Sequence, residues 1–393
     1  MNLLSKYACY IYISLWILYG LQRILMLKGI MAQVIFVILM MMSFYACYIV
    51  NRYYRIGPFI KWLNILLVVL TIYGLIPIIG GYSFHKGAYT SNVISNYTYL
   101  QGIYISVMPI YAFYFFSLKK KLLPDNITLV FWIFLVYSFA LYFQNFLKVT
   151  ADTNKEDIVN NIGFQFVPLI PMLLLVKIKN IWKYILAMVI FGFIILSMKR
   201  GAILTGGVML LLFLKQNFRV RTKQQLFYMF SLTCIAIFVM YRSVMNLYEQ
   251  NAFFHKRFDM TMHGYSSNRD KLFTYFWNYF TERTSVLEFF FGHGANGTLS
   301  LYGQYAHNDW LEFAINQGVL GLILYSVYWS VFAFEWNTYK GGKEKKQVLG
   351  DIMITYFLIA LFSMSFGSMP LCATLCIGYC LAMNYRKRIE TIW

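Results

Sequence analysis

The sequence predicts an all-α membrane protein with many transmembrane helices, and three observations lead to this prediction. Of its 393 residues, 60% are hydrophobic and only 12% are charged, whereas about 25% charged residues are usual in soluble domains. Apolar segments of the length that spans a bilayer as a helix, about 20 residues, recur along the chain. The net charge is +19, and its distribution follows a membrane topology. This composition leaves too little polar surface for a soluble enzyme, and neither a disordered tail nor a nucleic-acid-binding protein is expected.

Twelve apolar segments are predicted to cross the membrane. In chain order they are Tyr7–Leu21, Gly29–Val50, Ile60–Gly80, Tyr99–Leu118, Ile127–Leu147, Ile162–Val176, Ile181–Ser197, Gly201–Leu214, Leu226–Tyr241, Leu311–Phe334, Leu349–Phe366 and Pro370–Tyr385. Two of them, Ile162–Val176 and Gly201–Leu214, are short, so the expected number is about twelve, to within one or two. Because the segments are continuously apolar and do not alternate, they exclude a transmembrane β-barrel. We expect a single integral membrane domain over residues 1–393.

The large loop over residues 242–307 sets the predicted orientation. If this loop faces outside, alternation of the other segments places 21 of the 34 Lys and Arg residues inside, but only 5 of the 15 Asp and Glu residues. Every short inside loop is then basic, in agreement with the positive-inside rule. Both termini are therefore predicted to be cytoplasmic, and most of the positive charge reflects orientation and not a nucleic-acid partner.

Charged residues are almost absent from the interiors of the predicted spans. Lys183, Glu335 and Asp351 fall at span ends, where such side chains reach the interface. Ion-coupled transporters usually keep ionisable groups at mid-membrane, surrounded by discontinuous helices, and we expect neither feature here. A transporter is therefore disfavoured, and any chemistry is expected at the outer face.

The six cysteines all lie in apolar segments. Cys372, Cys376 and Cys380 are spaced four residues apart, which stacks them on one helix face. A metal site there would need further His or acidic ligands, and none is nearby in the sequence. We expect packing residues, with no metal and no other cofactor.

A first candidate segment is the hairpin Ser197–Gly201 between two short spans. Lys199 and Arg200 place two cations outside, at the boundary between membrane and water, against the charge rule. They are either snorkelling anchors or a corner that binds the phosphates of a lipid-linked substrate. The second interpretation rests on the bidentate contacts that arginine makes with phosphate oxygens.

A second candidate segment lies within loop 242–307. Arg269 precedes four apolar residues at helical spacing, namely Leu272, Tyr275, Phe276 and Tyr279. This amphipathic helix is predicted to lie against the membrane or the helical bundle. Gly292 and Gly294 permit a tight turn close to another backbone. Arg269 is either a solvated cation paired with Asp270 or Glu282, or part of a site near the start of the helix.

The third candidate segment lies where the loop re-enters the membrane. Its polar residues are His307, Asn308, Asp309 and Glu312. With Asp309 as the helix N-cap, Glu312 would complete a capping box, which is the structural alternative to a catalytic role for both acids. Gly318 and Gly321 lie inside the following span and would allow close helix contact.

These three segments, in this order, resemble the O-antigen ligase/polymerase superfamily of bacterial membrane glycosyltransferases. The Ser-x-x-Arg-Gly turn of that family is similar to Ser197, Arg200 and Gly201, and its arginine and Gly-x-Gly are similar to Arg269, Gly292 and Gly294. Its His-[Asn/Ser]-x-x-Leu-Glu motif, followed by Gly-x-x-Gly, is similar to His307, Asn308, Leu311, Glu312, Gly318 and Gly321. The resemblance covers residues 160–335, which we expect to be the catalytic region. Met198 and Lys199 depart from the small or polar residues that are common in the family.

The resemblance implies a GT-C-like fold that acts on undecaprenyl-diphosphate-linked glycans at the outer face of the bacterial cytoplasmic membrane. Arg200 and Arg269, helped by Lys199, would stabilise the charge that develops on the leaving lipid diphosphate. His307 would activate the acceptor hydroxyl, because imidazole titrates near neutral pH. Glu312 or Asp309 would orient His307 or take the proton.

Substrate binding is implied for Asn308, Asp309, Gly292 and Gly294, besides Lys199. Aromatic residues of the loop could stack on sugar rings, although most are expected to form the interfacial belt. They are Tyr265, Trp277, Tyr302, Tyr305 and Trp310.

Two activities in the superfamily fit these motifs. A polymerase adds the growing glycan to a fresh lipid-linked repeat unit, and a ligase transfers the finished glycan to lipid A-core or another acceptor. Polymerases are numerous and diverse in sequence, so an O-antigen or capsule polymerase is the favoured expectation. A flippase of lipid-linked oligosaccharides is the alternative from another class. Membrane lipid, a chain-length regulator and a flippase of the same pathway are the expected partners.

Overall fold

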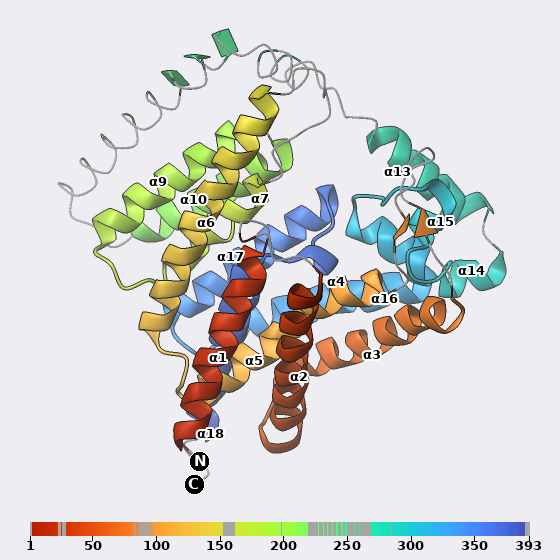
Figure 1. The fold of residues 1–393 in the computed structure, drawn as a ribbon, viewed down its shortest axis with the longest axis horizontal. Helices are drawn as coiled ribbons and strands as arrows, with labels where there is room; N and C mark the ends of the chain where they lie inside the picture. Colours follow the sequence, from red (N-terminus) through yellow and green to blue (C-terminus); the bar gives the residue numbers. More distant parts are fainter. Residues whose placement is uncertain are drawn as a thin grey trace. The chain divides into compact units, whose positions relative to one another are not determined.

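The computed structural model describes residues 2–22, 25, 29–81, 84–85, 93–94, 97–151, 162–197, 199–218, 269–283 and 285–389, with isolated positions between 227 and 259. The chain divides into two compact units. The first comprises Met1–Tyr19, Lys28–Lys121 and Ser266–Trp393, and the second Gly20–Leu27 and Leu122–Tyr265. The described part is helical apart from one antiparallel pair of two-residue strands (Figure 1).

The first unit contains most of the described helices. In chain order its elements are α1 (Asn2–Leu21), α2 (Ile30–Tyr53), α3 (Pro58–Ile79), β1 (Phe84–His85), β2 (Val93–Ile94), α4 (Thr98–Val107), α5 (Pro109–Leu118), α13 (Arg269–Asn278), the π-helical turn η1 (Tyr279–Arg283), α14 (Val286–Phe291), α15 (Gly297–Tyr302), α16 (Asp309–Asn337), α17 (Lys343–Phe362), the 3₁₀ turn η2 (Phe366–Ser368) and α18 (Leu371–Ile389). Helix α5 packs on α18 and α2, and α16 packs on α3, α14 and α17.

The second unit contains five described helices. They are α6 (Pro124–Ala151), α7 (Gly163–Phe166), α8 (Leu169–Met172), α9 (Asn180–Leu196) and α10 (Arg200–Phe218). Helix α9 packs on α7 and α10, and α10 packs on α8. The core here is rich in Phe, and the Phe193 ring lies 4.6 Å from that of Phe139 and 5.8 Å from that of Phe166.

Proline residues set several of the helix boundaries. Pro58 and Pro109 occupy the first turns of α3 and α5, where the missing N–H has no partner to lose. The predicted span Ile162–Val176 is not one continuous helix: it forms α7 and α8, with Pro168 between them. Proline cannot donate the backbone hydrogen bond that a continuing helix needs, which explains the interruption; whether this segment crosses the membrane stays a prediction.

Five described helices are long and apolar enough to cross a membrane. They are Ile30–Tyr53, Pro58–Ile79, Thr98–Leu118, Pro124–Asn145 and Asp309–Asn337. Shorter apolar helices span Tyr7–Leu21, Gly163–Met172, Asn180–Leu196 and Leu371–Asn384. These helices agree with the predicted class of helical membrane protein. The count of twelve spans and the sides on which the loops lie stay predictions, and the predicted span Leu226–Tyr241 lies outside the described residues except for isolated positions.

Helix α16 is broken near its N-terminal end. Gly318 has φ 66° and ψ −154° inside this helix, a combination that is almost restricted to glycine. The break leaves a short segment, Asp309–Gln317, before the long apolar part of α16. The prediction that the spans contain no discontinuous helix is therefore wrong.

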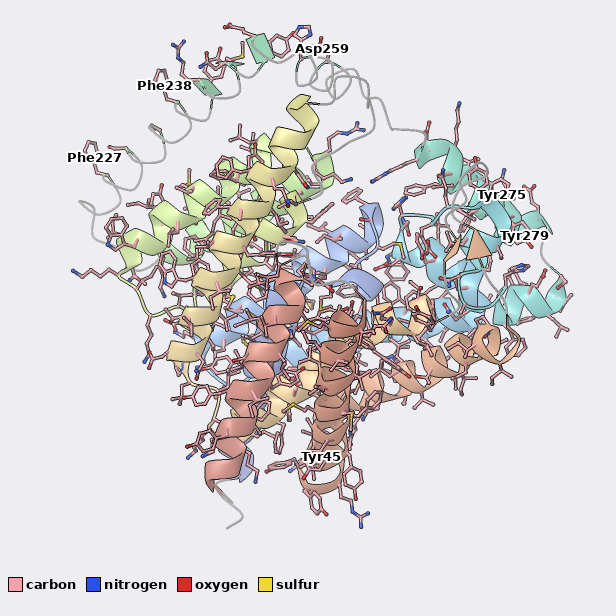
Figure 2. All side chains as sticks on the ribbon, in the orientation of Figure 1. Tyr45, Phe227, Phe238, Asp259, Tyr275 and Tyr279 are labelled. Atoms are coloured by element: carbon pink, nitrogen blue, oxygen red, sulfur yellow. The ribbon has the colours of Figure 1, made fainter. Side chains whose placement is uncertain are left out.

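The predicted amphipathic helix after Arg269 is confirmed as α13. Its Leu272 and Phe276 are buried in a cluster with four further residues, namely Phe280, Ala306, Ala314 and Ile315. Tyr275 and Tyr279, which are labelled in Figure 2, are partly buried and pack against this cluster. The helix thus joins the loop before α16 to the first segment of α16 through apolar contacts.

Candidate functional site

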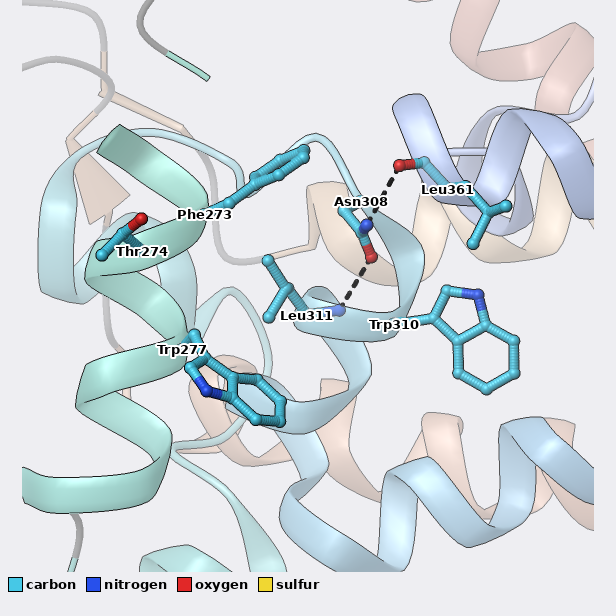
Figure 3. A pocket seen from close by; sticks show the side chains of 7 residues that line it. All are labelled: Phe273, Thr274, Trp277, Asn308, Trp310, Leu311 and Leu361. Atoms are coloured by element: carbon cyan, nitrogen blue, oxygen red, sulfur yellow. Dashed lines mark hydrogen bonds between the residues drawn. The ribbon is translucent and has the colours of Figure 1, made fainter. Parts of the chain in front are cut away.

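An open cleft of about 480 Å³ lies where α13, the start of α16 and the end of α17 meet (Figure 3). Its lining residues are Phe273, Thr274 and Trp277 of α13, Asn308, Trp310 and Leu311 at the start of α16, and Leu361 near the end of α17. Two tryptophans and an amide thus line one mostly apolar recess. Such a recess with few polar groups is typical of a site for a ligand with apolar faces.

Asn308 holds the start of α16 and connects it to α17. Its side-chain oxygen accepts a hydrogen bond from Leu311 N at 3.1 Å, so Asn308 is the N-cap of α16. Its side-chain nitrogen donates to the carbonyl oxygen of Leu361 at 3.1 Å. The predicted cap at Asp309 is therefore wrong by one residue: the helix begins at Asp309, and Asn308 makes the capping bond.

Asn308→Ala is expected to lower the free energy of unfolding by about 1–2 kcal/mol, because it removes the cap and the bond to Leu361. Asn308→Asp should lose less, since a carboxylate still caps α16 and only the donor to Leu361 is gone. Thermal unfolding of the purified protein in detergent checks this order. Equal stability of the Ala variant and the unsubstituted protein would contradict the assignment.

Arg269 is the first residue of α13 and lies one helical turn before the cleft residue Phe273. Its guanidinium donates to the carbonyl oxygen of Phe362 at 2.7 Å. Because α17 ends at Phe362, this carbonyl belongs to a helix C-terminus, where a cation is favourable. Arg269 and Asn308 thus contact consecutive carbonyls at the same end of α17.

The Asp309 side chain accepts several hydrogen bonds, most of them from the loop after α17. The buried carboxylate accepts from Ser365 N at 3.0 Å, from Phe366 N at 3.1 Å and from the Tyr325 hydroxyl at 2.9 Å, and it also contacts the Ser365 hydroxyl. A buried carboxylate needs such donors to offset its loss of hydration. This geometry favours a structural role, in which Asp309 ties α16 to the loop between α17 and α18.

Glu312 is also buried, at 5% exposure. Its two oxygens accept hydrogen bonds from Ala306 N at 2.6 Å, from the Thr298 hydroxyl at 2.8 Å and from the side-chain amide of Asn316 at 3.2 Å. It makes no capping box with Asp309, so that alternative is wrong for both acids. Because Ala306 directly precedes His307, the geometry favours Glu312 as a residue that positions the histidine loop over one that takes a proton.

His307 lies between two anchored residues. Ala306 is held by Glu312, and Asn308 is held by Leu361. The backbone of His307 has φ 53°, a left-handed conformation that is uncommon for residues other than glycine and is often found at functional sites. Tyr305, on the same loop, has its pKa raised to about 12 by burial and by the charge of Glu312, so its phenol stays protonated at neutral pH.

Gly292 and Gly294 make the predicted tight turn against another backbone. In this turn, His293 N donates a hydrogen bond to Ile315 O at 2.7 Å, and Gly294 N donates one to Asn316 O at 3.0 Å. These carbonyls lie just before the break at Gly318, where helical partners are missing. The two glycines therefore support the broken helix, and neither lines the cleft. The close contact predicted at Gly318 exists, but it is made with α14, whose Phe289 O would lie 2.6 Å from a Cβ at Gly318.

His293, between these glycines, pairs with Glu288. The His293 Nδ1 atom lies 3.2 Å from Glu288 Oε1, and both side chains are about one third exposed, at 32% and 34%. The pKa of Glu288 is lowered mainly by the hydrogen bond from the backbone N–H of Ser285. The Ser285 hydroxyl and His293 lower it by smaller amounts. This pair was not predicted from the sequence, because a lone loop histidine carries no signal.

Lys199 and Arg200 belong to the second unit. Helix α9 ends at Leu196 and α10 begins at Arg200, so the predicted tight hairpin is confirmed. Lys199 Nζ lies 6.0 Å from the centre of the Phe164 ring, and Arg200 is exposed at the N-terminus of α10. Two cations at this end of a helix are unfavourable by themselves, because the helix dipole is positive there.

Three further residues of this network were missed in the sequence. Ser365, Tyr325 and Thr298 bind the two buried acids, but they lie 14 to 56 residues away in the chain. No local spacing links them to His307, so only the folded chain could show them. Within the part of the chain that the structure describes, no three His, Cys, Asp or Glu side chains are grouped so that they could hold a metal ion.

The fold and the long apolar helices define a helical, membrane-embedded protein with an open cleft lined by α13, the start of α16 and the end of α17. No protein-family model matches the chain, and no curated protein is similar to it in sequence.

Proposed function

We propose that this protein is a membrane glycosyltransferase that polymerises lipid-linked repeat units of a bacterial surface polysaccharide. The donor is a growing glycan on undecaprenyl diphosphate, and the acceptor is a hydroxyl of a fresh lipid-linked repeat unit. The proposed place of reaction is the outer face of the cytoplasmic membrane. The sequence resemblance of Arg269, His307 and their neighbours to the O-antigen ligase/polymerase superfamily underlies this proposal.

The proposed reaction is one glycosyl transfer. The acceptor oxygen bonds to C1 of the donor glycan while the bond between C1 and the diphosphate oxygen breaks, and the diphosphate leaves with the electron pair. The proton of the acceptor hydroxyl passes to His307. Arg269 would stabilise the diphosphate by charge and hydrogen bonding. For Arg200 and Lys199, which belong to the second unit, the same role rests on the sequence resemblance alone.

The observation that best supports the proposal is the clustering of the motif residues at one cleft. Asn308 lines it, His307 precedes Asn308, and Arg269 lies one turn before a lining residue. The end of α17 holds both Arg269 and Asn308 through consecutive carbonyls. Trp277 and Trp310 add aromatic rings to the walls of the same cleft, and such rings offer apolar faces to sugars or prenyl groups.

A transporter of lipid-linked oligosaccharides is the second candidate, and the broken helix α16 is the observation that favours it. Discontinuous helices surround the binding sites of many transporters. The buried acids beside this break, however, direct their oxygens at protein donors from Thr298, Ala306, Asn316, Tyr325 and Ser365. Carboxylates whose oxygens already accept hydrogen bonds from the protein suit a structural role better than a role in ion coupling.

Deletion of the gene, followed by gel separation of surface glycans, tests the proposal. Loss of a polymerase should leave a single repeat unit on its carrier or core. Full-length glycan that accumulates on the lipid carrier would show a ligase instead. Lipid-linked repeats retained inside the cell would show a transporter, and either of these results would overturn the proposed activity.

Complementation of the deletion strain with Arg269→Ala should fail to restore glycan chains, although the inserted amount of protein stays normal. The expected loss of rate is about 10²–10³-fold, as for removal of one charge-stabilising donor. Lys271→Ala, which removes a neighbouring cation on the same helix, is the matched control and should restore full-length chains. Normal chain lengths with Arg269→Ala would remove Arg269 from the site.

A further inference from the structure

Helix α14 exposes an apolar face within the predicted outer loop. Val286, Leu287, Phe290 and Phe291 are 74%, 72%, 50% and 55% exposed. At 100° per residue these four side chains fall within an arc of about 140°. Phe289 points away from them and stacks on Phe280 at 5.1 Å, on the side of the buried cluster. One side of this short helix is therefore anchored in protein, and the other side is a continuous apolar surface.

This surface continues the exposed face of the membrane helix α3. The Tyr73 hydroxyl of α3 donates to Phe291 O at 2.6 Å, and Figure 1 shows α14 beside the end of α3. Tyr73 lies six residues before the end of α3 at Ile79, which corresponds to about 9 Å along the helix axis. On the same stretch of α3, Ile72, Ile76 and Ile79 are 56%, 53% and 83% exposed. Helix α14 is thus level with the last turns of a candidate membrane span and does not lie beyond them.

Several backbone groups at the ends of α14 have hydrogen-bond partners within the protein. At the N-terminus, Ser285 and Glu288 form a capping box, with Glu288 N bound to the Ser285 hydroxyl and Ser285 N bound to the Glu288 carboxylate. At the C-terminus, Gly292 N donates to Glu288 O, and Tyr73 supplies the donor for Phe291 O. A backbone segment at membrane depth requires such internal partners, because lipid offers none.

We propose that α14 is inserted into the outer leaflet of the membrane, with Val286, Leu287, Phe290 and Phe291 in contact with lipid acyl chains. The outer loop is then bound to the bilayer at the same place where its next residues, His293 and Gly294, bind the broken helix α16. The apolar face of α14 and the lipid-facing side of α3 form one surface. This inference does not depend on the proposed enzymatic activity.

Spin labelling of the full-length protein in lipid nanodiscs tests the proposal. Cys47 and Cys234, the cysteines that are not buried, are first replaced by serine, and a nitroxide is attached to Leu287→Cys. Oxygen concentrates in lipid and a water-soluble nickel chelate does not, so the ratio of their relaxation effects reports lipid contact. The label on Leu287→Cys should give a ratio several-fold higher than a label on Gln304→Cys, an exposed position of the same loop.

Two outcomes would overturn the inference. A ratio equal to that of Gln304→Cys would place α14 in water. Low accessibility to both oxygen and nickel would show that another protein surface, or a second copy of the chain, covers the face. Because both labelled positions are exposed, elution of the variants as the same monodisperse species as the unlabelled protein verifies that they fold.

Discussion

His307→Asn is expected to abolish glycan chain growth and to leave the amount of inserted protein unchanged. Asparagine adopts left-handed backbone conformations more readily than most residues, so it tolerates the φ of 53° at this position. It cannot accept a proton as imidazole does. The expected loss is about 10²–10⁴-fold in rate, the usual contribution of a general base, and it is measured as polymer formed from lipid-linked repeat units.

Two further variants separate chemistry from backbone effects. His307→Ala removes the imidazole and also replaces a residue type that is enriched in left-handed backbone conformations, so it should lose activity and some stability. His293→Gln changes another histidine of the same loop, which pairs with Glu288 outside the cleft, and should retain activity. Wild-type chain lengths with His307→Asn would refute the assignment of His307 as the base.

Gly292→Ala is expected to cause a large loss of stability. Gly292 has φ 76° and ψ −179°, a region that is almost restricted to glycine. An added Cβ would also overlap the backbone of Asn316 and Gln317, and backbone atoms cannot move aside as a side chain can. Strain and overpacking together should lower the free energy of unfolding by more than about 3 kcal/mol, measured by thermal or denaturant unfolding in detergent.

Gly294→Ala is the matched control for Gly292→Ala. Gly294 has φ 91°, but an added Cβ would meet nothing within 4 Å. Only backbone strain should remain, at about 1–2 kcal/mol. If both variants lowered the free energy of unfolding by the same amount, the contact between the turn and α16 would not contribute to stability. The difference between them therefore measures how firmly the turn at Gly292 is held against the break in α16.

Local patterns predicted the elements that depend on neighbouring residues. The amphipathic helix after Arg269, the hairpin at Ser197–Gly201 and the glycine turn at Gly292 all form as expected. Each depends on helical periodicity or on a backbone conformation that one or two residues require. The same reasoning failed where two patterns competed, since Asp309 and Asn308 are both good N-caps and only Asn308 makes the bond.

The roles of the two acids could not be predicted in this way. Asp309 and Glu312 are buried with donors that are far away in the chain, namely Ser365 and Thr298 on other segments and Tyr325 further along α16. These partners are 14 to 56 residues away in the chain. The neighbouring residues in a short polar motif suggest a catalytic role for a carboxylate. Whether the carboxylate can reach a substrate depends on its burial and on the hydrogen-bond donors around it.

The sequence by itself determined that this protein is embedded in a membrane, because continuous apolar length is a local property that the bilayer selects. It also determined which residues carry polar chemistry between the spans. Only the tertiary structure decided that Gly318 breaks α16, that Arg269 and Asn308 meet at the end of α17, and that α14 lies beside α3. The physical reason is that each of these contacts joins a backbone group freed at a helix end or break to a donor or acceptor far away in the chain.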